Sequence, residues 1–240
     1  MNEDFTEKRY GEILDLAASR FSFYPMSQIP ESKGAALWRH DIDFSPQRAH
    51  ALARMESDRG VIATYYVQPS ARFYSIFEPE VSAILRDIIG MGHEIGLHFD
   101  PSVYPEGELS PRLLVEKALL SDIAGSEVKS FSLHNPTTYD ASHFSDISIA
   151  GMVNATCPII RERFTYCSDS NGIWRFTPLK EVLEDPAVTS VYILTHPVWW
   201  TVDTMMPRDK IKRSIEGRAA AELSYYDALL AANNRPNIGN

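Results

Sequence analysis

The sequence predicts an α/β protein built on a parallel sheet or barrel. Short apolar runs typical of buried strands alternate along the chain with segments of helical periodicity. Crossovers of this kind make neighbouring strands parallel and cover both faces of the sheet. Five apolar runs also lead into a residue that binds metals or transfers protons, in segments 39–43, 92–100, 131–136, 166–169 and 194–197. Because the ends of barrel strands meet at one rim, these segments predict a mononuclear metal hydrolase.

Strands and helices are expected to alternate from residue 35 onward. The expected strands are 35–40, 61–67, 94–99, 129–134, 165–168 and 190–195. The expected helices are 46–58, 78–90, 111–124 and a closing helix at 207–233. Ser45-Pro46 and Ser110-Pro111 each resemble an N-cap followed by proline in the first turn, so each marks a helix start. The tail at 234–240 is expected to be loose.

Length and composition restrict the class of protein. With 240 residues, 44% of them hydrophobic, the chain can bury one sizeable core. Residues 1–240 are therefore expected to form one domain, with the motifs in a core at about 35–205. The net charge of -9 gives no basic surface on average, so nucleic acid is excluded as an expected partner.

Cysteine usage and the chain start predict the compartment. Two cysteines are too few for a disulfide framework, and no Cys-x-x-Cys zinc element occurs. The first ten residues are acidic where a secretory signal would be basic, and no apolar stretch is long enough to span a bilayer. We expect a cytoplasmic protein without stable membrane insertion.

Asp41 and Asp43 stand two residues apart at the end of a predicted strand, so their side chains can point to the same side of the backbone. Two carboxylates in one closed pocket repel each other. A divalent metal removes this conflict by binding one of them and leaving the other as a base. The alternative is a strand end at which one aspartate caps the next helix and the other is solvated.

His93 and His98 are five residues apart, so on one continuous strand they face opposite sides. They are therefore not expected to bind one metal together. His98 lies next to the strand end and is the candidate ligand, and Asp100 shares its parity. His93 is expected to hold a structural position before the strand.

His134 and His196 each close an apolar strand, and a proline follows each within two residues and stops the strand. Each strand thus delivers its histidine to the rim. One of them is expected to complete a shell of imidazole and carboxylate around a divalent ion, the composition typical of catalytic zinc. The other is then free to protonate a leaving group.

The order of these segments resembles the NodB-type polysaccharide deacetylase family, also called carbohydrate esterase family four. The resemblance covers residues 37–200 and is most specific at 39–43 and 92–98. The closest branch is associated with surface-polysaccharide, or O-antigen and lipopolysaccharide, biosynthesis. The resemblance implies a distorted (β/α) barrel of about seven strands and a metal held by one aspartate and two histidines. It also implies hydrolysis of an N-acetyl or O-acetyl group on a sugar.

The resemblance also implies roles for individual residues. Asp41 matches the family's catalytic base, and Asp43 matches its metal-binding aspartate. His98 matches the first histidine of the family's His-Ser/Thr-x-x-His metal motif. His196 matches the histidine of the last strand, the general acid.

Asp169 and Trp174 fall at the segment that supports this last histidine and lines the substrate groove in the family, and Asp169 is counted with the catalytic residues. Arg39, Trp174 and Trp199 are the candidate substrate-binding residues. Trp174, Trp199 and Trp200 can offer apolar faces to a sugar ring, and simple core packing is the alternative for Trp199 and Trp200.

The chain departs from the family pattern at the second metal histidine. Four residues after His98, where the family has that histidine, this chain has Ser102. Our hypothesis is that His134, arriving on the neighbouring rim strand, supplies the missing imidazole. Asp100 is the carboxylate alternative.

A second departure concerns the base. The arginine-proline motif that tethers the base in the family is replaced here by residues 132–136. Arg39 is expected to take over this task by pairing with Asp41 or Asp169, and an ordinary surface salt bridge is the alternative.

The expected substrate is a nucleotide-linked or lipid-linked acetylated sugar. Two other functions remain open from the sequence. One is a metal-dependent amidase that acts on a small C–N substrate other than a sugar, since a fold does not determine its substrate. The other is a catalytically inactive, saccharide-binding barrel.

Overall fold

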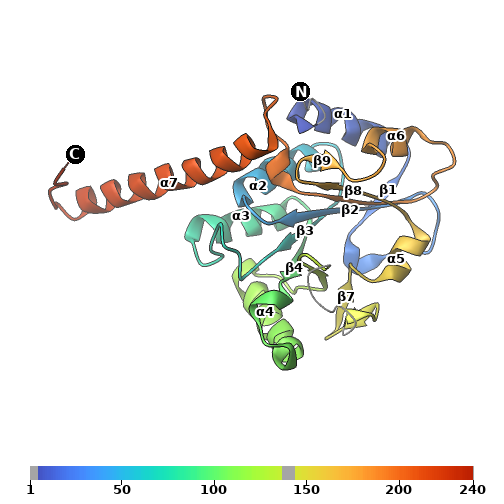
Figure 1. The fold of residues 1–240 in the computed structure, drawn as a ribbon, viewed down its shortest axis with the longest axis horizontal. Helices are drawn as coiled ribbons and strands as arrows, with labels where there is room; N and C mark the ends of the chain where they lie inside the picture. Colours follow the sequence, from blue (N-terminus) through green and yellow to red (C-terminus); the bar gives the residue numbers. More distant parts are fainter. Residues whose placement is uncertain (1–4, 137–143, 240) are drawn as a thin grey trace.

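The computed structural model describes residues 5–136 and 144–239. These residues form one mixed sheet with the strand order β6-β7-β5-β4-β3-β2-β10-β8-β9, and β1 pairs with β2 beside this path (Figure 1). The strands are β1 (Ser22–Tyr24), β2 (Ala35–Ile42), β3 (Thr64–Val67), β4 (Glu94–Phe99), β5 (Ser130–Leu133), β6 (Ser148–Ile149), β7 (Met152–Asn154), β8 (Thr165–Ser170), β9 (Ile173–Trp174) and β10 (Val191–Thr195).

The path from β7 through β5, β4, β3, β2 and β10 to β8 is parallel throughout. Antiparallel pairing occurs only where the short strands β6 and β9 join its two ends, within the described ranges. The predicted α/β class is therefore confirmed, and the parallel path has the expected seven strands. Among the described residues, no pairing between the two end strands closes the sheet into a barrel.

The helices follow the strands in the expected alternation. They are α1 (Glu7–Ala18), α2 (Pro46–Ser57), α3 (Pro79–Gly90), α4 (Leu109–Ala124), α5 (Pro158–Arg163), α6 (Leu179–Glu184) and α7 (Pro207–Ala232). None of the helices in the described ranges combines the length and the apolar character that a membrane span requires.

Strand β2 is buried along its whole length. Ala36 and Trp38 belong to the larger apolar cluster, which also holds buried residues of α1, α2 and α3. Ala35 and Leu37 belong to a second cluster on the opposite face. Because side chains alternate along a strand, Arg39 and Asp41 continue the second face, away from α1, α2 and α3.

Two helix starts test the capping predictions. Ser45 caps α2 as predicted, because its side chain accepts a hydrogen bond from the backbone N–H of Arg48 at 3.2 Å. The prediction that Ser110 caps the next helix is wrong. A 3₁₀ turn at Glu106–Glu108 leads directly into α4, which begins at Leu109, so Ser110 already lies inside the first turn.

Helix α1 has no counterpart among the predicted elements. Thr6 caps it by accepting a hydrogen bond from the Arg9 N–H, and its buried residues pack into the larger apolar cluster. The closing helix α7 is present within one residue of its predicted bounds. It extends away from the rest of the molecule, the red helix in Figure 1.

Candidate metal centre

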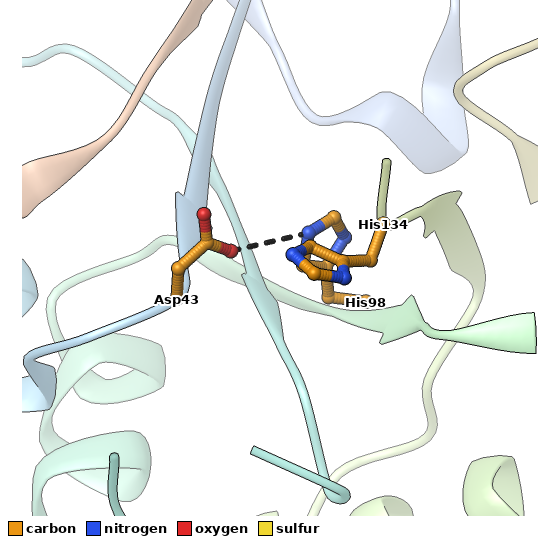
Figure 2. Close-up of side chains that lie close together, drawn as sticks. All are labelled: Asp43, His98 and His134. Carbon is orange, nitrogen blue, oxygen red and sulfur yellow. Dashed lines mark ion pairs between the residues drawn. The ribbon is translucent and has the colours of Figure 1, made fainter. Parts of the chain in front are cut away.

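Asp43, His98 and His134 lie close together at one edge of the sheet. One ligand atom from each side chain lies within 4.8 Å of those of the other two. Figure 2 shows the Asp43 carboxylate directed toward the two imidazole rings. Asp43 follows β2, His98 is in β4 and His134 follows β5, so three parallel strands deliver them at their carboxyl ends.

The pairing of β4 with β5 places the two histidines beside each other. His98 pairs with Ser132 in the strand register, and the backbone N–H of His134 donates to the Phe99 carbonyl at 2.8 Å. The ring centroids of His98 and His134 are consequently 5.2 Å apart. The hypothesis that His134 reaches the rim beside His98 agrees with this geometry.

His98 is oriented by a hydrogen bond on its far nitrogen. Its Nδ1 lies 2.7 Å from the Ser132 hydroxyl oxygen, and its Nε2 lies 3.3 Å from Asp43 Oδ1. When Nδ1 donates to Ser132, the lone pair of Nε2 faces the carboxylate of Asp43. A second partner that fixes the tautomer in this way is typical of metal-binding histidines.

His134 is oriented in the same manner by Asp100. His134 Nδ1 lies 3.0 Å from Asp100 Oδ2, and its Nε2 lies 3.2 Å from the Asn135 side-chain nitrogen. Ser102 holds the other carboxylate oxygen, with its N–H at 2.9 Å and its hydroxyl at 2.6 Å from Asp100 Oδ1. Burial alone would raise the pKa of Asp100, but the hydrogen bonds from His134 and Ser102 lower it to about 2. Asp100 therefore acts on His134 as an anion.

One carboxylate oxygen of Asp43 needs a positive charge beside it. Asp43 Oδ1 is buried and has no hydrogen-bond donor among the described residues. A buried carboxylate oxygen without a donor is costly unless a cation satisfies it. Two imidazoles and one carboxylate around this oxygen fit a divalent ion such as zinc.

Asp41 is held by Arg39 through two hydrogen bonds. Arg39 Nε donates to Oδ1 at 2.7 Å and Nη2 donates to Oδ2 at 2.6 Å, and both side chains are buried. Burial alone would raise the pKa of Asp41, but the charge of Arg39 holds it well below the usual range. Asp41 is therefore ionised, and its Oδ2 lies 3.7 Å from His98 Nε2.

The predicted pairing of Arg39 with Asp41 is thus confirmed, and the surface salt bridge is excluded because Arg39 is only 1% exposed. The guanidinium also donates to the Tyr192 hydroxyl at 2.8 Å. Contact between Arg39 and a substrate stays a prediction, and the burial favours the orienting role.

His196 lies near Asp43 Oδ2, whereas His98 lies near Asp43 Oδ1. Asp169 holds His196 by hydrogen bonds. Its Nδ1 is hydrogen-bonded to Asp169 Oδ1, its backbone N–H donates to Asp169 Oδ2 at 3.0 Å, and its Nε2 lies 3.7 Å from Asp43 Oδ2. Burial lowers the pKa of His196, but the charge and hydrogen bond of Asp169, with Asp43 and Asp41, raise it to about 10. The ring is therefore an imidazolium with one N–H directed at the cluster.

Thr195 and Trp200 position Asp169, and this role was not predicted for either residue. The Trp200 Nε1–H donates to the Thr195 hydroxyl at 2.7 Å, and that hydroxyl donates to Asp169. Trp200 is fully buried, so of the two alternatives for this tryptophan, core packing is correct. Thr195 precedes His196 in the sequence, which is the only signal that the chain offers for its role.

The two tryptophans proposed to bind substrate, Trp174 and Trp199, lie near phenylalanine rings. Trp174 stacks on Phe5 with ring centroids 4.9 Å apart. Trp199 is 5% exposed, and its ring lies 6.3 Å from that of Phe44. Sugar binding by Trp174 and Trp199 stays a prediction.

Two further histidines are structural. His93 accepts a hydrogen bond from the Ala63 N–H and donates to the Ala53 carbonyl, as expected for a position before the strand. His40 points to the helical face of β2, where its Nε2 lies 2.6 Å from Glu56 Oε1. Because side chains alternate along β2, His40 and Asp41 point to opposite faces of the sheet.

No protein-family model matches the sequence, and no curated protein matches it. Among solved structures, the chain is similar to a CE4 family pseudoenzyme from Bacillus anthracis, with 13% identity and a TM-score of 0.46. The similarity covers 82% of this chain, which spans 66% of the length of that one.

Two further solved structures are similar to a comparable degree. A family 4 carbohydrate esterase from Bacillus anthracis has 14% identity and a TM-score of 0.45 over 88% of this chain and 86% of its own. The Xyl-CE4 domain of a multidomain xylanase from the hindgut metagenome of Trinervitermes trinervoides has 12% identity and a TM-score of 0.48, over 78% and 83%.

Proposed function

We propose that the protein is a metal-dependent deacetylase that hydrolyses an N-acetyl or O-acetyl group on a sugar. The observation that carries the proposal is the convergence of Asp43, His98 and His134 around a buried carboxylate oxygen that lacks a donor. These three side chains would hold the ion. Asp41 lies 3.7 Å from His98 and His196 lies 3.7 Å from Asp43, so a base and an acid both stand next to the three residues.

A divalent ion at this position supplies Lewis acidity, which polarises the acetyl carbonyl and makes the attacking water acidic. Asp41 accepts the proton of that water as the water oxygen attacks the carbonyl carbon. Arg39 keeps Asp41 ionised and fixes its direction. Because the pKa of Asp41 is low, it takes a proton only from a strongly acidified water. The reaction is therefore expected to require the divalent ion.

His196 supplies the second proton. The Nε2–H of His196 is directed at the cluster. Its proton passes to the sugar nitrogen or oxygen as the bond from that atom to the acetyl carbon breaks. A nitrogen leaving group needs this proton because an amide anion is too basic to depart. Asp169 fixes the ring and stabilises its positive charge before transfer. The products are acetate and the deacetylated sugar.

The sugar substrate is proposed on the strength of the motif resemblance. We place the substrate in surface-polysaccharide biosynthesis as a nucleotide-linked or lipid-linked acetylated sugar in the cytoplasm.

The test combines metal analysis with acetate release. Elemental mass spectrometry of the purified protein is expected to find close to one divalent ion per chain. The protein is also expected to release acetate from N-acetylglucosamine oligomers or from a uridine diphosphate-linked N-acetyl sugar. Chelation should abolish release, and added zinc should restore it.

A matched pair of variants sharpens the test. His134→Ala should lose both the metal and the activity, whereas His50→Ala, on the surface of α2, should keep both. Undiminished metal loading in His134→Ala would exclude the proposed ligand set. A metal-loaded protein that releases acetate from no sugar, but from a small acetamide, would favour the amidase alternative.

A further inference from the structure

The outer half of α7, residues 219–232, is exposed on all sides. Each of these residues is exposed except Leu230, which is partly buried. Eleven of the fourteen are alanine, leucine or tyrosine. Leu223, Tyr225 and Tyr226 are 66%, 67% and 53% exposed. Figure 1 shows this half of the helix standing free of the rest of the molecule.

A helix of this composition is not expected to stand alone in water. Isolated helices of this length are marginal, and helices that are apolar on most sides are normally covered. Exposed apolar patches of this kind mark contacts with a partner. We therefore expect a binding partner to cover the outer half of α7.

The inner half of the same helix borders an open groove. The groove has a volume of about 710 Å³ and lies between α7, the start of α2 and the segment around residues 72–80. Its walls include Phe44, Phe73, Tyr74 and Ile215. The molecule thus carries a protruding apolar segment beside an unfilled groove with apolar walls, and Ala219, Ala221 and Glu222 at the start of the outer half also line this groove.

The charges of the two halves are complementary. Residues 207–218 contain five basic residues and two acidic ones, a net charge of +3, whereas residues 219–232 contain two acidic residues and no basic one, a net charge of -2. Arg72 and Arg213, which line the groove, have no carboxylate partner within 4 Å among the described residues. Glu222 already lies 3.4 Å from Arg218 of its own chain, so Asp227 of another copy is the suitable partner for these arginines.

We propose that two copies of this chain form a two-fold dimer in which the α7 helices pair antiparallel. The outer half of each helix then lies along the inner half of the other and beside its groove. The contact is isologous, because the same two surfaces meet twice. Ala219, Ala220 and Ala221 stand at the crossing point, where small side chains let the helices approach closely.

A membrane surface is a poorer occupant than a second copy. Helices that lie on membranes carry lysine or arginine on their polar face, which anionic lipids attract. The outer half of α7 carries only Glu222 and Asp227 as charged residues. The observations therefore favour the dimer.

The first test is the mass of the full chain in solution, by sedimentation equilibrium at micromolar concentration. A dimer has twice the chain mass of 27.1 kDa. The double variant Leu223→Asp, Tyr226→Asp should weaken dimerisation at least tenfold. The variant should still fold as a monomer, since both side chains are more than half exposed in the single chain. Phe176→Asp is the matched control, because Phe176 is 68% exposed and lies elsewhere, and it should stay dimeric.

The second test concerns the direction of pairing, by distance measurement between spin labels. Labels on Ala220→Cys should lie close together across the dimer, and labels on Ala232→Cys should lie roughly 36 Å apart, from 1.5 Å per residue over twelve residues in each direction. Short distances at both positions would overturn the antiparallel arrangement. A wild-type monomer, a dimer that survives the double variant, or binding of the monomer to phosphatidylglycerol vesicles would each overturn the dimer.

Discussion

Asp100 holds His134 by a hydrogen bond of 3.0 Å to Nδ1, and Ser102 anchors the same carboxylate through its other oxygen. Ser102 stands where the resembling family has its second metal histidine. In this chain that position supports the orienting partner of a different histidine. Asp100 thus connects Ser102 to His134.

Asp100→Asn should weaken zinc binding about 10-fold to 100-fold, which is typical of removing a partner of a metal-binding histidine. The amide still accepts from Ser102 but no longer offers a charge to His134. Calorimetric titration with zinc measures the effect. Asp87→Asn, an exposed carboxylate on α3, serves as the control, and equal affinities for both variants would contradict the orienting role.

Arg39→Lys should lower kcat by about 100-fold while zinc content stays unchanged, because a misdirected base is costly even at small displacements. Lysine keeps the charge but cannot make the paired Nε and Nη2 hydrogen bonds to Asp41. Steady-state acetate release compared with metal content separates the two effects. A parallel loss of zinc would show that Arg39 acts on the metal site instead.

The metal-free protein should lose stability as the pH rises from about 7 toward 10, through the pair of His196 and Asp169. The pKa of His196 is raised to about 10 in the folded chain, against an ordinary value near 6.5. The stabilisation is fully present below the unfolded pKa and is lost as the pH passes through the folded one. One such group contributes a slope of up to about 1.4 kcal/mol per pH unit.

Denaturant unfolding in chelator at several pH values measures this slope. Asp169→Asn should flatten it, because the main charge that raises the pKa of His196 is then absent. A slope that Asp169→Asn leaves intact would assign it to other groups.

Gly96→Ala should destabilise the fold by about 1–3 kcal/mol, the usual cost of overpacking. A Cβ at this position in β4 would clash with the Tyr66 ring, over which the Arg39 guanidinium lies at 5.0 Å from the ring centroid. Unfolding free energies measure the cost. Gly90→Ala, where an added Cβ meets nothing within 4 Å, should be neutral or stabilising and is the matched control.

Much of the fold follows from local patterns. Strand β2 and helix α2 are predictable because an apolar run stops at a polar strand end and Ser45-Pro46 starts a helix. Helix α1 was not predicted, since its buried face is defined only by the strands it covers. The start of α4 was misplaced because a preceding 3₁₀ turn, which leaves little trace in the sequence, overrides the Ser110-Pro111 signal.

The sequence by itself determined which residues can do chemistry and, through strand parity, that Asp41 and Asp43 lie on one face and His93 and His98 on opposite ones. Only the tertiary structure decided their partners. Pairing of Ser132 with His98, of Asp100 with His134 and of Thr195 with Asp169 joins separate segments. Such contacts depend on the register between strands and on loop closure, and local sequence periodicity carries no information on either.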